Sequence, residues 1–179
     1  TDQDNNQITA FHPGAMGEAH QNNVADAANI SLGIVAPDGR DAMLQHSRDF
    51  ATLGLPFMFD PGQNLPLFSK DELLSCIDQA TWCVMNDYES QLMMKITELT
   101  LDDIASQVDA LIVTRGGEGS CIYARNKLID IPAVSIQAAV DPTGCGDAFR
   151  AGLLHGLNSG WDWETCGRAA SLLGAFKVE

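Results

Sequence analysis

The sequence has few basic residues: it contains 10 lysines and arginines against 24 aspartates and glutamates, and its formal net charge is −14. A negative field of this size repels nucleic-acid phosphates and anionic lipids, so we expect neither nucleic acid nor a membrane as a partner. No apolar run approaches the roughly 18 residues of a membrane-spanning helix. The opening residues, Thr-Asp-Gln-Asp-Asn-Asn-Gln, do not resemble a signal peptide.

Cysteine pairs are also missing. The five cysteines are an odd number, and no two of them form a C-x-x-C pair. This pattern excludes a disulfide framework and a cysteine-based zinc site, and it indicates reduced thiols in a cytoplasmic protein. A G-x-G-x-x-G motif is likewise absent from every predicted strand-to-helix junction, which argues against a nicotinamide-dependent oxidoreductase.

The composition is typical of a folded protein, with 45% hydrophobic and 19% charged residues. Apolar strand patterns alternate with helical patterns. The expected strands are residues 7–11, 30–35, 56–59, 82–85, 110–114, 120–124 and 127–131, with a strand-like segment at 136–140. The expected helices begin near residues 38–41, 69, 89, 100, 148 and 162. This alternation predicts an α/β fold, a doubly wound and mostly parallel sheet flanked by helices.

A glycine-rich loop is the most informative segment. It reads Asp141-Pro142-Thr143-Gly144-Cys145-Gly146-Asp147-Ala148-Phe149 and precedes an apolar helical pattern. Its glycines let consecutive N–H groups point in one direction, and the helix adds its positive N-terminal end. Such a loop suits a phosphate whose negative charge grows during transfer. A carboxylate at the loop edge suits removal of a proton from an attacking hydroxyl.

The same loop resembles the D-T-x-G-x-G-D-x-F signature of the PfkB/ribokinase family of carbohydrate and nucleoside kinases, with Pro142 in place of the usual Thr. The resemblance implies that Asp147 is the catalytic base and that the backbone of Gly144, Cys145 and Gly146 forms the anion hole. A plain glycine-rich turn before a helix is the alternative.

Asn86-Asp87-Tyr88-Glu89 matches the N-x-x-E motif of this family. Residues three apart at a helix start share a face, so the amide and the carboxylate can point to one locus. The resemblance implies that Asn86 and Glu89 organise Mg²⁺ and phosphate, with Glu89 reaching the metal through water. The alternative is an ordinary helix start with an Asn N-cap and Glu at the third position.

Three further segments carry weaker matches. Thr114, Gly116 and Gly119 resemble the T-x-G-x-x-G segment that lines the ATP site in the family, although a tight hairpin turn explains them as well. The segment from Asp60 to Asn64 resembles the strand-end turn near the acceptor and phosphate site of the family, which makes Asp60 a candidate acceptor-binding residue, although an ordinary Asp-Pro-Gly turn explains it as well. Phe11 is expected to cover a nucleoside base or a sugar, or else to pack within the lid.

Asp141 and Thr143 match positions that help to bind a monovalent cation, K⁺, in the family; a turn role for Asp141 is the alternative. The resemblance covers only the later part of a family member. We therefore expect residues 1–14 to belong to a small β lid, and residues 15–179 to form a kinase domain incomplete at both ends. Pairing of the edge strand at residues 7–11 would allow a homodimer.

The sequence therefore predicts an enzyme that uses ATP and Mg²⁺ to phosphorylate a hydroxymethyl group. The segment 6–11 and the Gly-Asp-Ala-Phe-Arg-Ala-Gly run resemble bacterial adenosine kinase-like members, so the expected acceptor is a nucleoside. The alternatives are a sugar kinase of ribokinase or fructokinase type and a non-catalytic nucleotide- or sugar-binding protein with the same fold.

Overall fold

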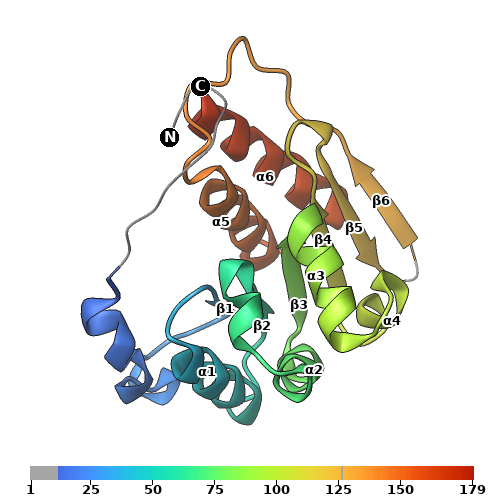
Figure 1. Ribbon diagram of the computed structural model, residues 1–179. Helices are drawn as coiled ribbons and strands as arrows, with labels where there is room; N and C mark the ends of the chain where they lie inside the picture. Colours follow the sequence, from blue (N-terminus) through green and yellow to red (C-terminus); the bar gives the residue numbers. More distant parts are fainter. Residues whose placement is uncertain (1–11, 126) are drawn as a thin grey trace.

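The computed structural model describes residues 12–125 and 127–179, and these form one six-stranded sheet with helices on both faces (Figure 1). The strands are β1 (Gly33–Val35), β2 (Phe57–Phe59), β3 (Trp82–Asn86), β4 (Ala110–Thr114), β5 (Ser120–Ala124) and β6 (Lys127–Ile131). The helices are α1 (Arg40–Thr52), α2 (Lys70–Gln79), α3 (Asp87–Thr97), α4 (Leu101–Ala105), α5 (Cys145–Asn158) and α6 (Trp163–Val178). Short 3₁₀ helices occupy Gly14–Gln21, Val24–Asp26, Gly62–Leu67 and Gly116–Glu118.

The strands lie in the sheet in the order in which they occur in the chain, from β1 to β6. Strands β1 to β4 are parallel, each joined to the next through one or two helices, whereas β5 and β6 add to the sheet as antiparallel hairpins. The helices α1 to α4 that join these strands all pack on the same core, and crossovers of one hand on one face make a parallel sheet grow in one direction. The predicted α/β class is confirmed, with a mixed sheet.

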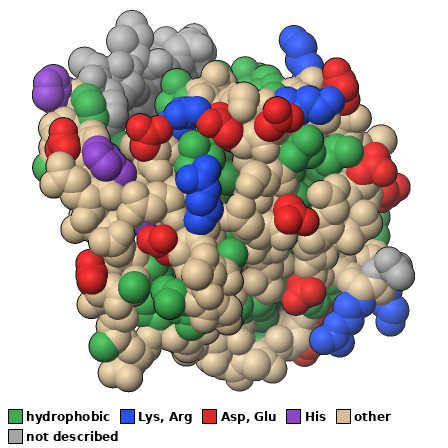
Figure 2. Space-filling model, turned by 90° about the horizontal axis from the view of Figure 1, so that it is seen from below, with side chains coloured by type: hydrophobic (Ala, Val, Ile, Leu, Met, Phe, Trp, Pro, Cys, Tyr) green, Lys and Arg blue, Asp and Glu red, His purple; other side chains and the backbone are tan. Residues whose placement is uncertain are grey.

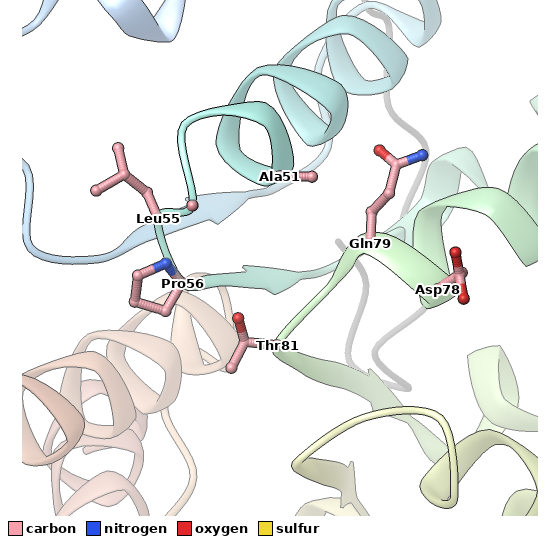
Figure 3. Close-up of a pocket in the computed structure, with 7 residues that line it drawn as sticks. Ala51, Leu55, Pro56, Asp78, Gln79 and Thr81 are labelled. Atoms are coloured by element: carbon pink, nitrogen blue, oxygen red, sulfur yellow. The ribbon is translucent and has the colours of Figure 1, made fainter.

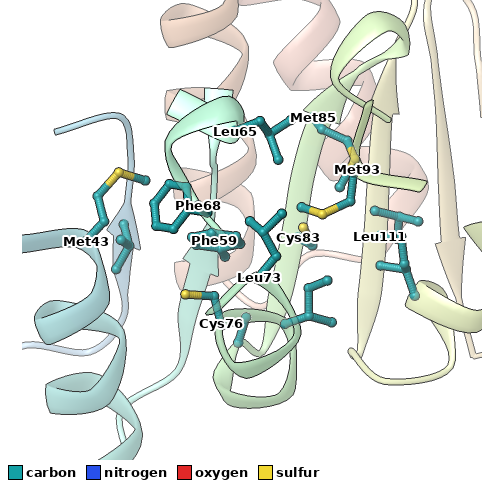
Figure 4. Close-up of a cluster of buried hydrophobic side chains, with 14 of the residues drawn as sticks. Met43, Phe59, Leu65, Phe68, Leu73, Cys76, Cys83, Met85, Met93 and Leu111 are labelled. Carbon is teal, nitrogen blue, oxygen red and sulfur yellow. The ribbon is translucent and has the colours of Figure 1, made fainter. Parts of the chain in front are cut away.

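Alternate strand residues face two separate cores. Phe57 and Phe59 enter the core beneath α1 to α4, while Met58 between them enters the core beneath α5 and α6. The same two-residue period runs through β3 and β4, as a strand buried on both faces requires. Figure 4 shows the first core, where Phe59, Leu73 and Met85 converge.

Local signals position the helices as expected. Ser69 and Thr100 each form a capping box with the acidic residue three positions later. Gly54 adopts a φ of 65° just after α1, the left-handed conformation that ends a helix. Helix α5 begins at Cys145, three residues earlier than the apolar pattern predicted, so Asp147 lies inside its first turn.

Two predicted strands have different outcomes. Residues 136–140 are not a strand, because no strand in the described part of the chain pairs with them; instead the Val140 N–H donates to the Val178 carbonyl at the end of α6. Residues 7–11 lie outside the described residues, as does most of the segment 1–14 that we expect to be a lid.

Within the described ranges, no helix has the length and apolar character needed to cross a bilayer. On the face drawn in Figure 2, acidic side chains are scattered among basic and hydrophobic ones instead of gathering in one patch.

Candidate active site

The site lies at the edge of the sheet where the parallel strands end. Asn86 is the last residue of β3 and Thr114 the last of β4, and the strand register places them opposite each other. Asp60 directly follows β2 at the same edge, and its backbone N–H donates to the Val35 carbonyl at the end of β1. Polar residues from separate loops therefore converge, as they do at the carboxyl edge of other open α/β sheets.

The glycine-rich loop opens helix α5 without a side-chain cap. Gly144 occupies the N-cap position with φ 79° and ψ 3°, a left-handed conformation that favours glycine. The Cys145 N–H donates to the Pro142 carbonyl at 3.0 Å. In the described residues, no acceptor is recorded for the N–H groups of Gly144, Gly146 and Asp147. These three N–H groups are free for an anion, whereas the Cys145 N–H, also expected in the anion hole, is used by the turn.

Asp147 projects from the first turn of α5 with its side chain 89% exposed. Its Oδ1 atom lies 3.5 Å from Nη1 of Arg150, one turn later on the same helix. The Nε atom of Arg150 forms an ion pair with Oδ2 of Asp60, whose side chain is only 1% exposed. The open carboxylate of Asp147 is thus reachable by a substrate, while that of Asp60 is enclosed.

Burial controls the ionisation of Asp60. Removal from water raises the pKa of this carboxyl to about 6, and Arg150 opposes the rise without cancelling it. The negative charges of Glu89 and Asp147 raise the pKa further. The Asp60 side chain is enclosed and paired with Arg150, and its expected contact with an acceptor stays a prediction.

Asn86 and Glu89 form a capping box at the start of α3. The Glu89 N–H donates to Asn86 Oδ1 at 2.7 Å, and the Asn86 N–H donates to Glu89 Oε2 at 2.8 Å. The alternative to a metal role is therefore realised in the structure. It leaves the second oxygen of Glu89, a residue 9% exposed, without a role in the cap.

A cavity of about 790 Å³ adjoins this edge of the sheet. It brings together six of the residues expected at the ATP site or the anion hole: Asn86, Thr114, Gly116, Gly119, Cys145 and Gly146. Apolar residues of segment 133–142 and of α6 complete the wall. A cavity of this size with a mainly apolar lining suits a nucleotide base with its sugar.

The 115–119 loop is a hairpin turn as well as part of the cavity wall. It joins β4 to β5, and the Arg115 N–H donates to the Gly119 carbonyl at 2.8 Å. Gly119 has a φ of 87°, and a Cβ placed on it would lie 2.1 Å from the Ile131 carbonyl oxygen. Both interpretations of the T-x-G-x-x-G segment are compatible with this geometry.

Asp141 and Thr143 form a local turn. The Thr143 N–H donates to Asp141 Oδ1 at 2.9 Å, which holds the pKa of this carboxyl below its usual range. The other oxygen, Oδ2, lies 3.9 Å from Lys177 Nζ. The role of Asp141 and Thr143 in binding a monovalent cation stays a prediction. Phe11, expected over the acceptor, lies outside the described residues.

Several cavity residues were missed by the sequence analysis. They are Tyr88 beside the capping box, Phe149 on α5, and the small residues Ser171, Gly174 and Ala175 on α6. The three small residues are three and four positions apart, a spacing that places them on one helix face. This spacing of small residues is the sequence pattern that could have indicated a helix face lining a cavity.

A second hollow, of about 470 Å³, lies at the opposite edge of the sheet, between the ends of α1 and α2 (Figure 3). Leu55, Pro56 and Thr81, which line it, precede β2 and β3. None of the expected site residues is part of it, so we assign the chemistry to the carboxyl edge.

Comparison with known proteins shows the family of the chain. The family model described as "pfkB family carbohydrate kinase" matches residues 1–179. A nucleoside kinase of Methanocaldococcus jannaschii is 37% identical over 179 residues, which are 100% of this chain and 59% of that protein. A fructokinase of Escherichia coli is 34% identical over 110 residues. The match covers 56% of this chain and 36% of the fructokinase.

Among solved structures, the nucleoside kinase of Burkholderia thailandensis in complex with inosine superposes with a TM-score of 0.96 at 53% identity, over 99% of this chain and 58% of that one. The same kinase has been solved in complex with ADP-inosine. The chain thus spans somewhat less than three fifths of the length of these relatives.

Proposed function

The chain belongs to the pfkB family of carbohydrate kinases, and on this premise we propose that it carries the phosphate-transfer machinery of an ATP-dependent nucleoside kinase. One observation carries the proposal: the exposed Asp147 carboxylate stands at the start of α5 beside the free N–H groups of Gly144 and Gly146. A base and an anion hole thus share one helix turn. Residues 15–179 form the proposed kinase domain, and residues 1–14 part of the lid.

In the proposed reaction, Asp147 accepts the proton of an acceptor hydroxymethyl group. The acceptor oxygen forms a bond to the γ-phosphorus of ATP as the bond from that phosphorus to the β–γ bridging oxygen breaks, and ADP leaves with the electron pair. The N–H groups of Gly144, Gly146 and Asp147 stabilise the charge on the transferred group. The helix dipole of α5 adds to this stabilisation.

ATP is assigned to the cavity of about 790 Å³. Thr114, Gly116 and Gly119 would border the nucleotide, and the wall formed by 133–142 and α6 would enclose its base. The absence of side-chain bulk at the glycines allows close approach of the backbone.

Mg²⁺ is assigned to the start of α3. The described residues contain no cluster of three or more acidic, His or Cys side chains able to hold a metal. Glu89 and Asn86 fit an ion that is held mainly by phosphate and water: Glu89 would reach it through a water molecule, and Asn86 would lie beside it. When bound, Mg²⁺ neutralises phosphate charge. Asp141 and Thr143 would contribute to a site for a monovalent cation, K⁺, and no step depends on that ion.

The proposed acceptor is a nucleoside, because kinases named for nucleosides are similar over the full length of this chain. An adenosine-like base is proposed only on the sequence resemblance of segment 6–11 and of the Gly-Asp-Ala-Phe-Arg-Ala-Gly run. The similarity to a fructokinase covers only part of it. A sugar acceptor therefore remains an outcome of the test rather than a second proposal.

The test is release of ADP by the full-length gene product, with Mg²⁺-ATP and a panel of nucleosides, ribose and fructose. We expect turnover with a nucleoside and its loss, by orders of magnitude, in Asp147→Asn, which keeps nucleotide binding. Turnover only with a sugar would show that the acceptor is a sugar and not the proposed nucleoside. An ATP-binding protein without acceptor-dependent turnover, or one unaffected by Asp147→Asn, would refute the kinase mechanism.

A further inference from the structure

The site contains an arginine to which no motif assigned a role. Arg150 lies one turn after Asp147 on α5, and its side chain is 19% exposed. Its Nη1 atom lies 3.5 Å from Asp147 Oδ1, and its Nε atom pairs with Asp60 Oδ2. One guanidinium thus bridges the exposed carboxylate on α5 and the buried carboxylate after β2.

The glycine-rich loop leaves room for this bridge. A Cβ placed on Gly146 would lie 2.6 Å from Arg150 Nη1, closer than such atoms approach. The guanidinium therefore lies directly against the backbone whose N–H groups form the proposed anion hole. A side chain at position 146 would have to displace the guanidinium.

Asp60 has the features of an anchor. Its side chain is 1% exposed. Neither its Oδ1 atom nor Nε of Arg150 has a hydrogen-bond partner in the described part of the chain, so the contact of Nε with Oδ2 is a close ion pair without hydrogen-bond geometry. Among residues 12–125 and 127–179, the charged groups that face Asp60 are Arg150, Glu89 and Asp147, and of these only Arg150 is positive. A buried carboxylate needs a counter-charge, so Asp60 holds the arginine in place.

We propose that Arg150 is a positioning residue for Asp147, with Asp60 as its anchor. The inference rests on the proposed kinase function. The exposed Asp147 side chain would otherwise sample several rotamers. The planar fork of the guanidinium has donors enough to hold both carboxylates at once, which a single ammonium group does less well. Arg150 thereby keeps the base directed toward the acceptor hydroxyl.

The experiment uses the full-length gene product and four variants: Arg150→Gln, Arg150→Lys, Asp147→Asn, and the double variant Asp147→Asn with Arg150→Gln. Arg168→Gln is the matched control, because Arg168 is 60% exposed on α6 and pairs with Glu164 on the same helix. Steady-state kinetics gives kcat and the KM for ATP, and circular dichroism checks folding.

We expect Arg150→Gln to lower kcat roughly 10- to 100-fold, the scale set by a misplaced catalytic group, while the KM for ATP changes less than about 3-fold. Arg150→Lys should fall between this variant and the wild type. In the Asp147→Asn background, Arg150→Gln should cause no further loss, because its effect acts through Asp147. Arg168→Gln should match the wild type.

An unchanged kcat in Arg150→Gln would overturn the inference, as would an equal loss in the wild-type and Asp147→Asn backgrounds. If Arg150→Gln does not fold, Arg150→Lys decides, since it keeps a positive charge beside Asp60. Wild-type kcat in the lysine variant would then overturn the proposal. Full turnover in Asp147→Asn would instead refute the kinase mechanism, so the two failures can be told apart.

Discussion

Asn86 and Thr114 are register partners at the last positions of β3 and β4. The chain after Asn86 enters α3 through a capping box, and the chain after Thr114 turns back into β5. One strand pairing therefore aligns the proposed metal and nucleotide segments on the wall of one cavity. Variants in either loop therefore test this site.

Glu89→Gln separates the metal role of this residue from its capping role. The glutamine amide oxygen can still accept from the Asn86 N–H, so we expect the free energy of unfolding to change by less than about 1 kcal/mol. Loss of the negative charge should raise the Mg²⁺ concentration for half-maximal activity roughly 10-fold or more, by analogy with other residues that hold a metal indirectly.

The measurements are urea unfolding and Mg²⁺ titration of ADP release, with Glu89→Ala as the comparison that loses both roles. If Glu89→Gln leaves the Mg²⁺ dependence unchanged, Glu89 serves only as a cap.

Gly119→Ala tests the hairpin turn, with Gly117→Ala as its matched control in the same loop. Gly119 has φ 87° and ψ −138°, and an added Cβ would meet the Ile131 carbonyl oxygen at 2.1 Å, a contact with rigid backbone. We expect it to lower the free energy of unfolding by about 2–4 kcal/mol. Nothing lies within 4 Å of a Cβ on Gly117, so that variant should stay within about 1 kcal/mol of the wild type. Equal unfolding midpoints in urea would contradict the described turn.

Asp60→Asn tests the enclosed carboxylate through the pH dependence of stability. The pKa of Asp60 is raised from 3.8 to about 6 in the folded protein, so between these values the folded state keeps a proton that the unfolded chain has lost. The free energy of unfolding therefore falls as pH rises through this window, by about 3 kcal/mol for a shift of this size. Asp60→Asn should lack this fall.

The measurement is urea unfolding at several pH values from 4 to 7. The slope of the free energy of unfolding against pH is compared between variants, so that the pH-independent cost of the substitution cancels. Asp78→Asn, at an exposed position on α2, serves as the control. The same pH slope in Asp60→Asn and the wild type would show that Asp60 is not buried as described.

Local patterns in the sequence predicted most helices and strands, but they could not predict which distant segments pair with one another. The strands at 110–114, 120–124 and 127–131 were predicted with their observed bounds, because apolar runs and a glycine turn mark them directly. The strand expected at 136–140 from its apolar residues was wrong. A strand also needs a partner strand, and in the described chain none pairs with this segment.

The same limit applies to the site. The motifs predicted which loops meet, because the carboxyl ends of parallel strands share one edge. They did not predict the pairing of Asp60 with Arg150, which lie far apart in sequence and show no spacing pattern. The capping box at Asn86 was predicted only as an alternative, since the same two residue types serve a cap and a metal site.

Thiol modification tests the cavity independently of catalysis. Cys145 is partly exposed and lines the cavity, whereas the other four cysteines are buried. We expect one fast-reacting thiol in the native full-length protein, absent in Cys145→Ser. If the cavity holds the nucleotide, ADP at 100 times its dissociation constant should slow this reaction roughly 100-fold, because only the free protein reacts. Mass spectrometry of alkylated peptides with and without ADP measures both effects. A rate for Cys145 that ADP does not change, in protein shown to bind ADP, would place the nucleotide elsewhere.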